Sequence, residues 1–238
     1  MVEPAARFEQ IKIPLADSAQ GLSEVSGVLG VPRWWPTGAR VSICLAHGSR
    51  RDHTDPLIES LHRELTERRY LTLRFNFPFA EAKKRRPDSM QVLGRTFRAA
   101  IEALSRDPTA APAHLFIGGI GLGGQVAAEL AGSRVRVDGL FLLGFPLHPP
   151  GKPDERKAEE LFRIVSPVLF LQGSRDRSCD LNVLRRTLLR VGAPSTLRIT
   201  RDADHQFKVL KKSGRTPDEV QDELMNNIDT WVQKILED

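Results

Sequence analysis

Three features of this sequence follow strand-like segments and could do chemistry together. The first is a glycine-rich turn, Gly118–Gly124 ("GGIGLGG"), which follows the apolar run "HLFI" and precedes a helix-like segment. The second is Asp176, after "PVLFLQ", and the third is His205, after "STLRIT". In a mostly parallel sheet, the residues that follow the strands form the site. A turn, an acid and a histidine in this chain order are typical of a nucleophile, its orienting acid and its base.

The spacing assigns a role to each group of such a site. His205 would remove a proton from the nucleophile, and Asp176 would fix its tautomer and stabilise the imidazolium. In the turn pattern Gly-x-Ser-x-Gly the nucleophile position falls on Gly121, which has no side chain. Backbone N–H groups would stabilise an oxyanion, one from Leu122 and one from the loop after an earlier strand. That loop contains His47, Gly48 and Ser49, and we expect His47 and His148 at the pocket rim.

The same turn also fits a second motif, Gly-x-Gly-x-x-Gly, with Gly119, Gly121 and Gly124. A dinucleotide site of this kind needs an acidic residue about 20 residues on, at the end of the next strand. The next strand-like run, "GLFLLGF", ends in Phe145 instead. Three or four strands also precede the turn, whereas a dinucleotide turn usually follows the first strand of its unit. Dinucleotide binding is therefore the remote alternative.

The elements that must position these residues alternate between strand-like and helix-like segments. Several strand-like runs are apolar on both faces, which indicates a doubly wound, mostly parallel α/β sheet flanked by helices. We expect one domain over residues 1–238, with an edge strand in about the first 20 residues and no large lid. Loops at Pro78–Pro87 and Pro146–Lys157 are expected at the pocket rim. Thr216 and Glu219 predict a capping box that starts the C-terminal helix.

Composition limits the classes of partner. The 238 residues carry a net charge of +5 with scattered basic residues, apart from Lys83–Arg86 ("KKRR"), which we interpret as a solvated loop. No aromatic residues interleave with that run, so nucleic acid is not indicated. No apolar run approaches the ~18 residues of a membrane span, and Cys44 and Cys179 lie outside any CxxC pattern. We predict a cytoplasmic protein with no metal and no cofactor.

Several longer motifs resemble a known family. "LAHGSRRDHTDPLI", "GFPLHPPGKP", "FLQGSRD" and "DADHQFKVLKKSGRT" resemble the dienelactone-hydrolase-like branch of the α/β-hydrolase superfamily. Within it they are similar to the hydrolase-like domain of a testis-expressed protein and of a subunit of the non-specific-lethal chromatin complex. The resemblance implies the α/β-hydrolase fold, Asp176 as acid and His205 as base. It places the nucleophilic serine of a turn like "GKSMGG" at Gly121, where this chain departs from the pattern.

The missing serine leaves several functions open. The leading hypothesis is an esterase-like protein for small acyl or ester-like ligands that is impaired or non-catalytic as a serine hydrolase. One alternative is an enzyme in which His205 and Asp176 activate water or deprotonate a substrate without a covalent intermediate. Another is a non-catalytic module that binds a protein partner. A displaced nucleophile would have to be Ser49 or Cys179. The sequence specifies neither the ligand nor the oligomeric state.

Overall fold

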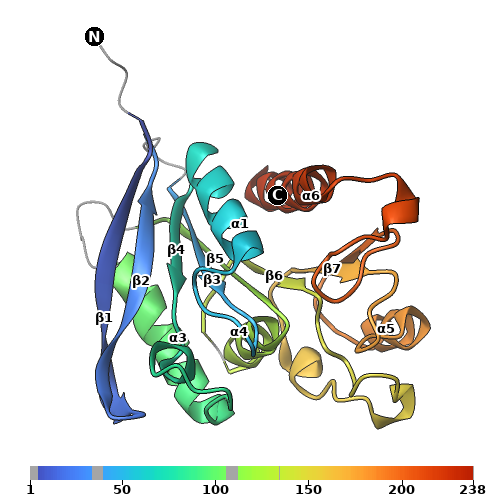
Figure 1. Ribbon diagram of the computed structural model, residues 1–238, viewed down its shortest axis with the longest axis horizontal. Helices are drawn as coiled ribbons and strands as arrows, with labels where there is room; N and C mark the ends of the chain where they lie inside the picture. The colour runs from blue at the N-terminus through green and yellow to red at the C-terminus, as the bar shows by residue number, and fades with distance from the viewer. Residues whose placement is uncertain (1–4, 34–39, 106–111, 134, 238) are drawn as a thin grey trace. The chain divides into compact units, whose positions relative to one another are not determined.

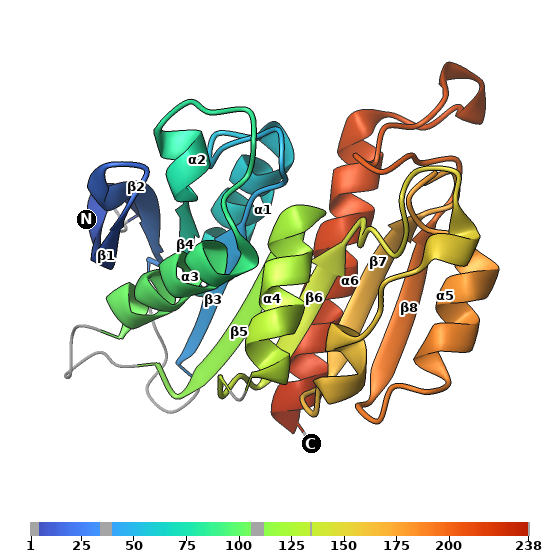
Figure 2. The same ribbon diagram turned by 90° about the horizontal axis from the view of Figure 1, so that it is seen from below.

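The computed structural model of the chain describes residues 5–33, 40–105, 112–133 and 135–237. The chain divides into two compact units, Met1–Gly118 and Gly119–Asp238. The strand order is β1-β2-β4-β3 in the first unit, and β5-β6-β7-β8 from the strand at the boundary onward. Figures 1 and 2 together label these strands along the chain.

The four strands of the first unit begin with a hairpin. β1 (Arg7–Ala19) and β2 (Leu22–Val31) pair antiparallel around Gln20-Gly21, both with positive φ (55° and 79°). A turn of this kind matches the right-handed twist of the strands that it joins. β2 pairs antiparallel with β4 (Leu71–Phe75), and β4 pairs parallel with β3 (Val41–Ala46). Every residue of β3 and β4 is buried, as expected of strands covered on both faces.

Three helices accompany these strands. α1 (Pro56–Glu67) starts after Asp55, whose carboxylate accepts hydrogen bonds from two N–H groups of the first turn. α3 (Met90–Leu104) is capped in the same way by Ser89. The short α2 (Pro78–Glu81) follows β4. Figures 1 and 2 show α1 and α3 on opposite faces of the strands of this unit.

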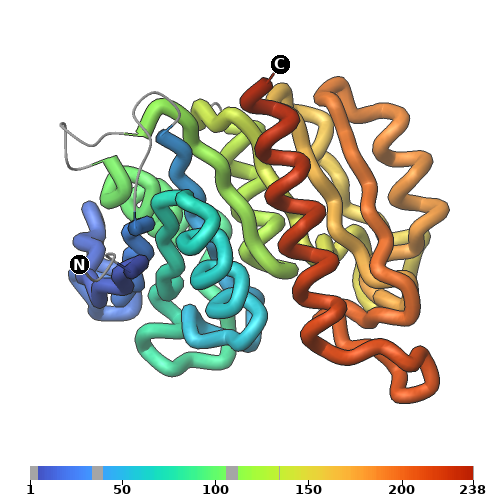
Figure 3. The backbone as a smooth tube through the Cα atoms, turned by 90° about the horizontal axis from the view of Figure 1, so that it is seen from above, coloured from blue at the N-terminus to red at the C-terminus, as the bar shows by residue number. Residues whose placement is uncertain are grey.

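The second unit continues the alternation of strands and helices. Its elements, beginning with the strand that crosses the boundary, are β5 (His114–Ile120), α4 (Leu122–Gly132), β6 (Gly139–Leu143), β7 (Val168–Gly173), α5 (Leu181–Leu188), β8 (Ser195–Thr200) and α6 (Pro217–Glu237). Three 3₁₀ turns lie at Pro153–Glu155, Glu160–Arg163 and Lys211–Ser213. β6 pairs parallel with β7, and β7 pairs parallel with β8. α6 packs on β6, β7 and β8, and Figure 3 shows it running along these strands. Figure 1 shows α4 and α5 on the opposite face of the same strands.

The predicted fold class is confirmed as a mostly parallel α/β arrangement flanked by helices, with no large lid in the described residues. Two local expectations were incomplete. The segment after β4 was expected to be a loop, but α2 occupies its start. α5 was not expected, although Asp180 marks its start by accepting hydrogen bonds from two first-turn N–H groups. Both helices are short, so neither shows a long apolar period in the sequence.

α6 is the longest helix and its predicted start is confirmed. The Thr216 hydroxyl accepts a hydrogen bond from the Glu219 N–H (3.2 Å), and the Glu219 carboxylate accepts one from the Thr216 N–H (2.7 Å). This reciprocal pair is a capping box. Val220, Leu224 and Ile228 lie on the buried face of the helix. In the described ranges, neither α6 nor any other helix combines the length and the apolar character needed to cross a membrane.

The capping box predicts a measurable loss of stability. Thr216→Ala removes the side-chain acceptor and should lower the free energy of unfolding by about 1 kcal/mol. Chemical denaturation of the two proteins measures this difference. Thr216→Ser keeps the hydroxyl oxygen and should restore most of the loss. Equal losses in both variants would show that packing of the threonine methyl group, rather than the cap, is responsible.

Candidate functional site

The glycine-rich turn joins β5 to α4 in the second unit. Gly121 has φ +54° and ψ −112°, a backbone conformation that L side chains rarely adopt and that glycine adopts without strain. Its N–H donates to the Leu143 carbonyl (2.9 Å), and its carbonyl accepts from the Gln125 N–H (3.1 Å). These bonds tie the turn to β6 and start α4. Leu122 is the first residue of α4, where N–H groups have no partner within the helix.

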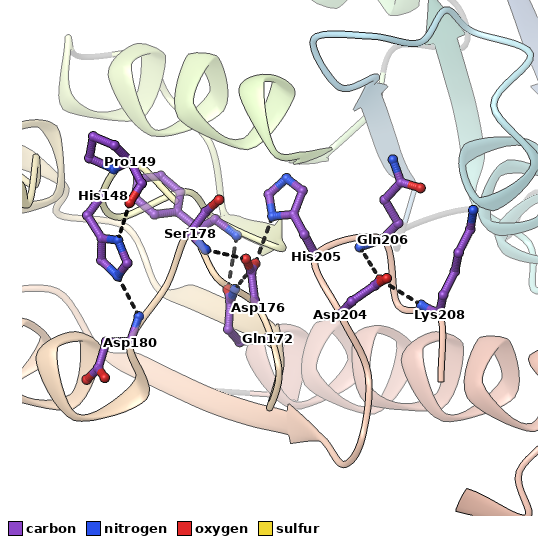
Figure 4. A network of polar contacts seen from close by, with 11 residues as sticks. His148, Pro149, Gln172, Asp176, Ser178, Asp180, Asp204, His205, Gln206 and Lys208 are labelled. Atoms are coloured by element: carbon purple, nitrogen blue, oxygen red, sulfur yellow. Dashed lines mark hydrogen bonds and ion pairs between the residues drawn. The ribbon is translucent and has the colours of Figure 1, made fainter. Parts of the chain in front are cut away.

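The structure brings His205 and Asp176 together, and Figure 4 shows their side chains facing each other. The Nδ1 of His205 donates to Oδ2 of Asp176 at 2.7 Å. The Asp176 side chain has no exposed surface, whereas that of His205 is 36% exposed. With the Nδ1 proton held by the carboxylate, Nε2 of the neutral ring has a lone pair and can accept a proton. This geometry suits a general base with an orienting acid.

Two further groups hold the carboxylate of Asp176. The Ser178 N–H donates to Oδ1 (2.7 Å), and the Gln172 side-chain amide donates to Oδ2 (2.6 Å). Gln172 is fully buried at the end of β7, and its side-chain oxygen Oε1 accepts from the Phe145 N–H (3.0 Å). Gln172 was not among the site residues expected from the sequence. The available signal was a single amide in the apolar run "VLFLQG", because a buried amide needs polar partners.

Close approach at two glycines positions the loop that carries His205. A Cβ atom at Gly173 would lie 2.4 Å from the Asp204 carbonyl oxygen, and one at Gly144 would lie 2.6 Å from the His205 carbonyl oxygen. Only glycine leaves room for the loop at these positions. Within the loop the Asp204 carboxylate accepts from the N–H groups of Gln206 and Lys208, as Figure 4 shows. Packing against the two glycines and the hydrogen bonds to Asp204 therefore hold the backbone that carries the imidazole of His205 in place.

The surroundings of His205 favour its charged form. The hydrogen bond to Asp176 raises the pKa of His205 above its ordinary value, burial opposes this, and the charges of Asp176 and Asp204 add to the rise. Histidine is the side chain whose ordinary pKa lies closest to physiological pH. The same ring can then serve as acceptor when neutral and as donor when charged.

Two other candidate residues of the second unit have structural partners. His148 is buried, and its Nε2 accepts from the Asp180 N–H (2.8 Å) while Nδ1 faces the Pro149 carbonyl oxygen (2.8 Å). Both ring nitrogens are thus bound to backbone. Cys179 is buried, and burial with the nearby charges of Asp176 and Asp180 raises the pKa of its thiol to about 12. A thiol in this state is a poor nucleophile, so Cys179 is disfavoured as a displaced one.

The remaining candidates, His47, Gly48 and Ser49, follow β3 in the first unit. His47 is fully buried, and its Nε2 accepts from the Phe77 N–H (3.1 Å) while Nδ1 faces the Gly48 carbonyl oxygen (2.8 Å). Burial lowers the pKa of His47 to about 4, so the ring is neutral. Ser49 is exposed. The oxyanion and pocket-rim roles of these residues stay predictions.

The second unit offers no acidic residue where a dinucleotide would need one. β6, the strand after the glycine-rich turn and its helix, ends at Leu143 and is followed by Gly144 and Phe145. Within the described ranges, no group of three or more His, Cys, Asp or Glu side chains is arranged to hold a metal ion.

Solved structures with the same fold include several hydrolases. A dienelactone hydrolase from Anabaena variabilis has a TM-score of 0.72 at 18% identity, over 96% of this chain and 98% of that one. An esterase from Pyrococcus furiosus has a TM-score of 0.73 at 14% identity, over 96% and 91%. A lidless α/β serine hydrolase from Xanthomonas campestris has a TM-score of 0.71 at 16% identity, over 94% of each chain. At these identities the likeness concerns the fold.

The family follows from the sequence match. A model of the alpha/beta hydrolase domain matches residues 39–233, which include the glycine-rich turn, Asp176 and His205. The match covers most of the chain and agrees with the mostly parallel α/β architecture. The chain therefore belongs to the alpha/beta hydrolase domain family.

Proposed function

We propose that this chain is an esterase-type α/β-hydrolase that is silenced at its nucleophile position, Gly121, and that keeps the capacity to hold a small acyl or ester-like ligand. The His205–Asp176 pair is the retained base and acid. On this proposal the chain carries out no serine-type acyl transfer at an enzymatically useful rate, because glycine has no group that could attack a carbonyl carbon.

One distance carries the proposal. A Cβ atom at position 121 would lie 3.1 Å from Nε2 of His205. A hydroxyl one bond further out would be within hydrogen-bonding reach of that nitrogen after a small shift of the ring. The turn geometry and the base are thus those of a serine site, whereas the residue between them has no side chain. Removal of the nucleophile from a well-studied serine protease lowers turnover about 10⁶-fold.

The relatives support the substrate class, and the sequence motifs support a finer placement. The dienelactone hydrolase and the esterase share the fold of this chain, and both of their names refer to ester-type substrates. The motifs around His148 and His205 support a place near the testis-expressed and non-specific-lethal-complex proteins. A cytoplasmic location and a protein partner belong to the same proposal.

A second candidate function is hydrolysis by water that His205 activates directly. The observation in its favour is the completeness of the support around Asp176, whose buried carboxylate accepts three hydrogen bonds, from His205, Gln172 and Ser178. Such a network would serve a working general base as well as a silent one. Its chemistry needs no covalent intermediate, so neither candidate function predicts a fluorophosphonate label on the native chain. The two differ in whether the native chain hydrolyses an ester and loses that activity in His205→Ala.

Gly121→Ser tests the proposal directly. The native chain should not hydrolyse a short activated aryl ester, and the serine variant should do so at least about 10²-fold faster, since the nucleophile accounts for up to about 10⁶ in turnover. The variant, and not the native chain, should take a fluorophosphonate label, which mass spectrometry detects. Because the positive φ strains any side chain, the serine variant should also lose about 1–3 kcal/mol of stability.

Gly121→Ala is the matched control, because it adds the same Cβ at the same φ without a hydroxyl. It should be as destabilised as the serine variant and remain inactive. Native activity equal to that of Gly121→Ser, and lost in His205→Ala, would replace the proposal by the water mechanism. If no variant is active or labelled, the site is not a hydrolase site and a binding role replaces it.

The pair of His205 and Asp176 also predicts a pH dependence. Asp176→Asn removes the main cause of the raised pKa, so the imidazole of His205 should titrate at a lower pH in the variant than in the native chain. NMR titration of the ring protons measures the pKa of His205 in both proteins. A range of about pH 5 to 9 is suitable because it includes the ordinary histidine pKa of ~6.5. An unchanged pKa in the variant would contradict the role given to the carboxylate.

The same shift fixes the sign of its effect on stability. A pKa that is higher in the folded than in the unfolded chain stabilises the fold fully below the unfolded value. That contribution is lost as the pH rises through the folded value. The stability advantage of the native chain over Asp176→Asn should therefore be largest below about pH 6 and should shrink above it. Thermal unfolding across this pH range provides the measurement.

A further inference from the structure

A cavity in the first unit is lined mainly by basic side chains. Its volume is about 680 Å³, within the range of sites for small molecules. Two segments form it, one after β3 and one around the end of α2. The lining residues are Ser49, Arg50, Arg51, Asp52, Phe79, Ala80, Lys83, Lys84 and Arg85. The four residues of the run "KKRR" are exposed, as expected of a solvated segment, and three of them also line this cavity.

The charge around the cavity is strongly unbalanced. Five of the lining side chains are cationic, and Asp52 is the one carboxylate. Asp52 accepts hydrogen bonds from the Thr54 hydroxyl (2.6 Å) and N–H (2.8 Å). Within the part of the chain that the structure describes, Arg50, Lys83 and Arg85 make no ion pair. Like charges gathered around a concave space repel one another and attract an anion.

The backbone at Lys83 is held in a conformation that favours glycine. Its φ is +54°, and it closes α2 with bonds from the Lys83 N–H to the Ala80 carbonyl (2.9 Å) and from the Lys84 N–H to the Phe79 carbonyl (2.7 Å). A helix that ends this way usually has glycine at this position. A lysine there strains the backbone while adding a cation to the cavity lining, and such strain is characteristic of functional sites.

Side-chain hydrogen bonds keep this segment ordered. The Asp88 carboxylate accepts hydrogen bonds from the Phe79 N–H (2.8 Å) and from the side-chain amide nitrogen of Gln20 (2.5 Å). The side-chain oxygen of Gln20 in turn accepts a hydrogen bond from the Lys84 ammonium. Gln20 lies in the turn of the β1–β2 hairpin. The segment is therefore held at Phe79 and at Lys84, which lowers the conformational cost of binding a ligand there.

We propose that this cavity binds a small phosphorylated molecule, whose phosphate groups contact Arg50, Lys83 and Arg85. Arginine matches phosphate oxygens with paired donors, and lysine adds a point charge, so several such groups favour a multiply charged oxyanion over a single carboxylate. The concave shape favours a small molecule over a nucleic acid, and the one aromatic residue in the lining, Phe79, is 1% exposed and cannot stack on a base. This site goes beyond the function proposed for the second unit.

Two neighbouring arginines give a matched test. Both arginines are exposed, but Arg85 lines the cavity and Arg86 does not, so Arg85→Gln and Arg86→Gln remove the same charge at adjacent positions. Calorimetric titration of the full chain with tripolyphosphate should show one site per chain. Arg85→Gln should weaken its binding by about tenfold, as expected for one charged hydrogen-bonding group. Arg86→Gln should weaken it less than about twofold, because an exposed charge outside the site acts through screened attraction.

Lys83→Gly separates binding from folding. It should weaken tripolyphosphate binding by about fivefold or more for loss of one cation, and it should leave the melting temperature unchanged or higher because the strain is relieved. An equal loss of tripolyphosphate affinity in Arg85→Gln and Arg86→Gln would overturn the proposal, because it would mean that the anion is attracted by the overall positive charge of this surface and not by contacts in the cavity. Citrate binding as tight as tripolyphosphate, or tighter binding of a short oligonucleotide, would overturn the phosphorylated small molecule as the ligand. So would the absence of any saturable binding.

Discussion

The hydrogen bond between Asp176 and His205 depends on a carboxylate that has no contact with solvent. A buried charge without partners costs several kcal/mol, so the surrounding structure must supply the donors. The end of β7, the turn that follows it and the loop after β8 each contribute one of them, through Gln172, Ser178 and His205. The parallel pairing of β7 with β8 therefore matters for the chemistry, since it brings these segments to the same edge.

The turn at Gly121 has a different relation to its neighbours. Its conformation is one that most residues adopt only under strain, and in a working serine hydrolase that strain is offset by the surrounding structure. With glycine the strain is absent while the direction of the chain is retained. Loss of a side chain at such a position thus affects chemistry more than folding.

Much of the fold could be predicted from the sequence, because long periodic segments such as α3 and α6 and fully apolar strands such as β3 carry strong local signals. The chain order of turn, acid and histidine was also sufficient to identify the pair that lies at 2.7 Å. Gln172 escaped notice because its importance lies in which atom it contacts, and one amide in an apolar strand does not reveal that. The basic cavity escaped notice for a related reason. Ser49–Asp52 and Lys83–Arg85 are distant in sequence, and only folding of the first unit makes them neighbours.

The close approach of the His205 loop to Gly144 and Gly173 has a consequence for the interpretation of sequence variation. Neither glycine carries a functional group, and a single added methyl at either position would collide with backbone oxygen atoms. A saturation mutagenesis screen would mark these two positions as intolerant, much as it would mark residues that act on a ligand. At these two glycines, intolerance to substitution would reflect the space that the histidine loop needs and not a contact with a ligand. Maps of mutational sensitivity in this fold therefore combine steric effects and functional effects, which only the structure can separate.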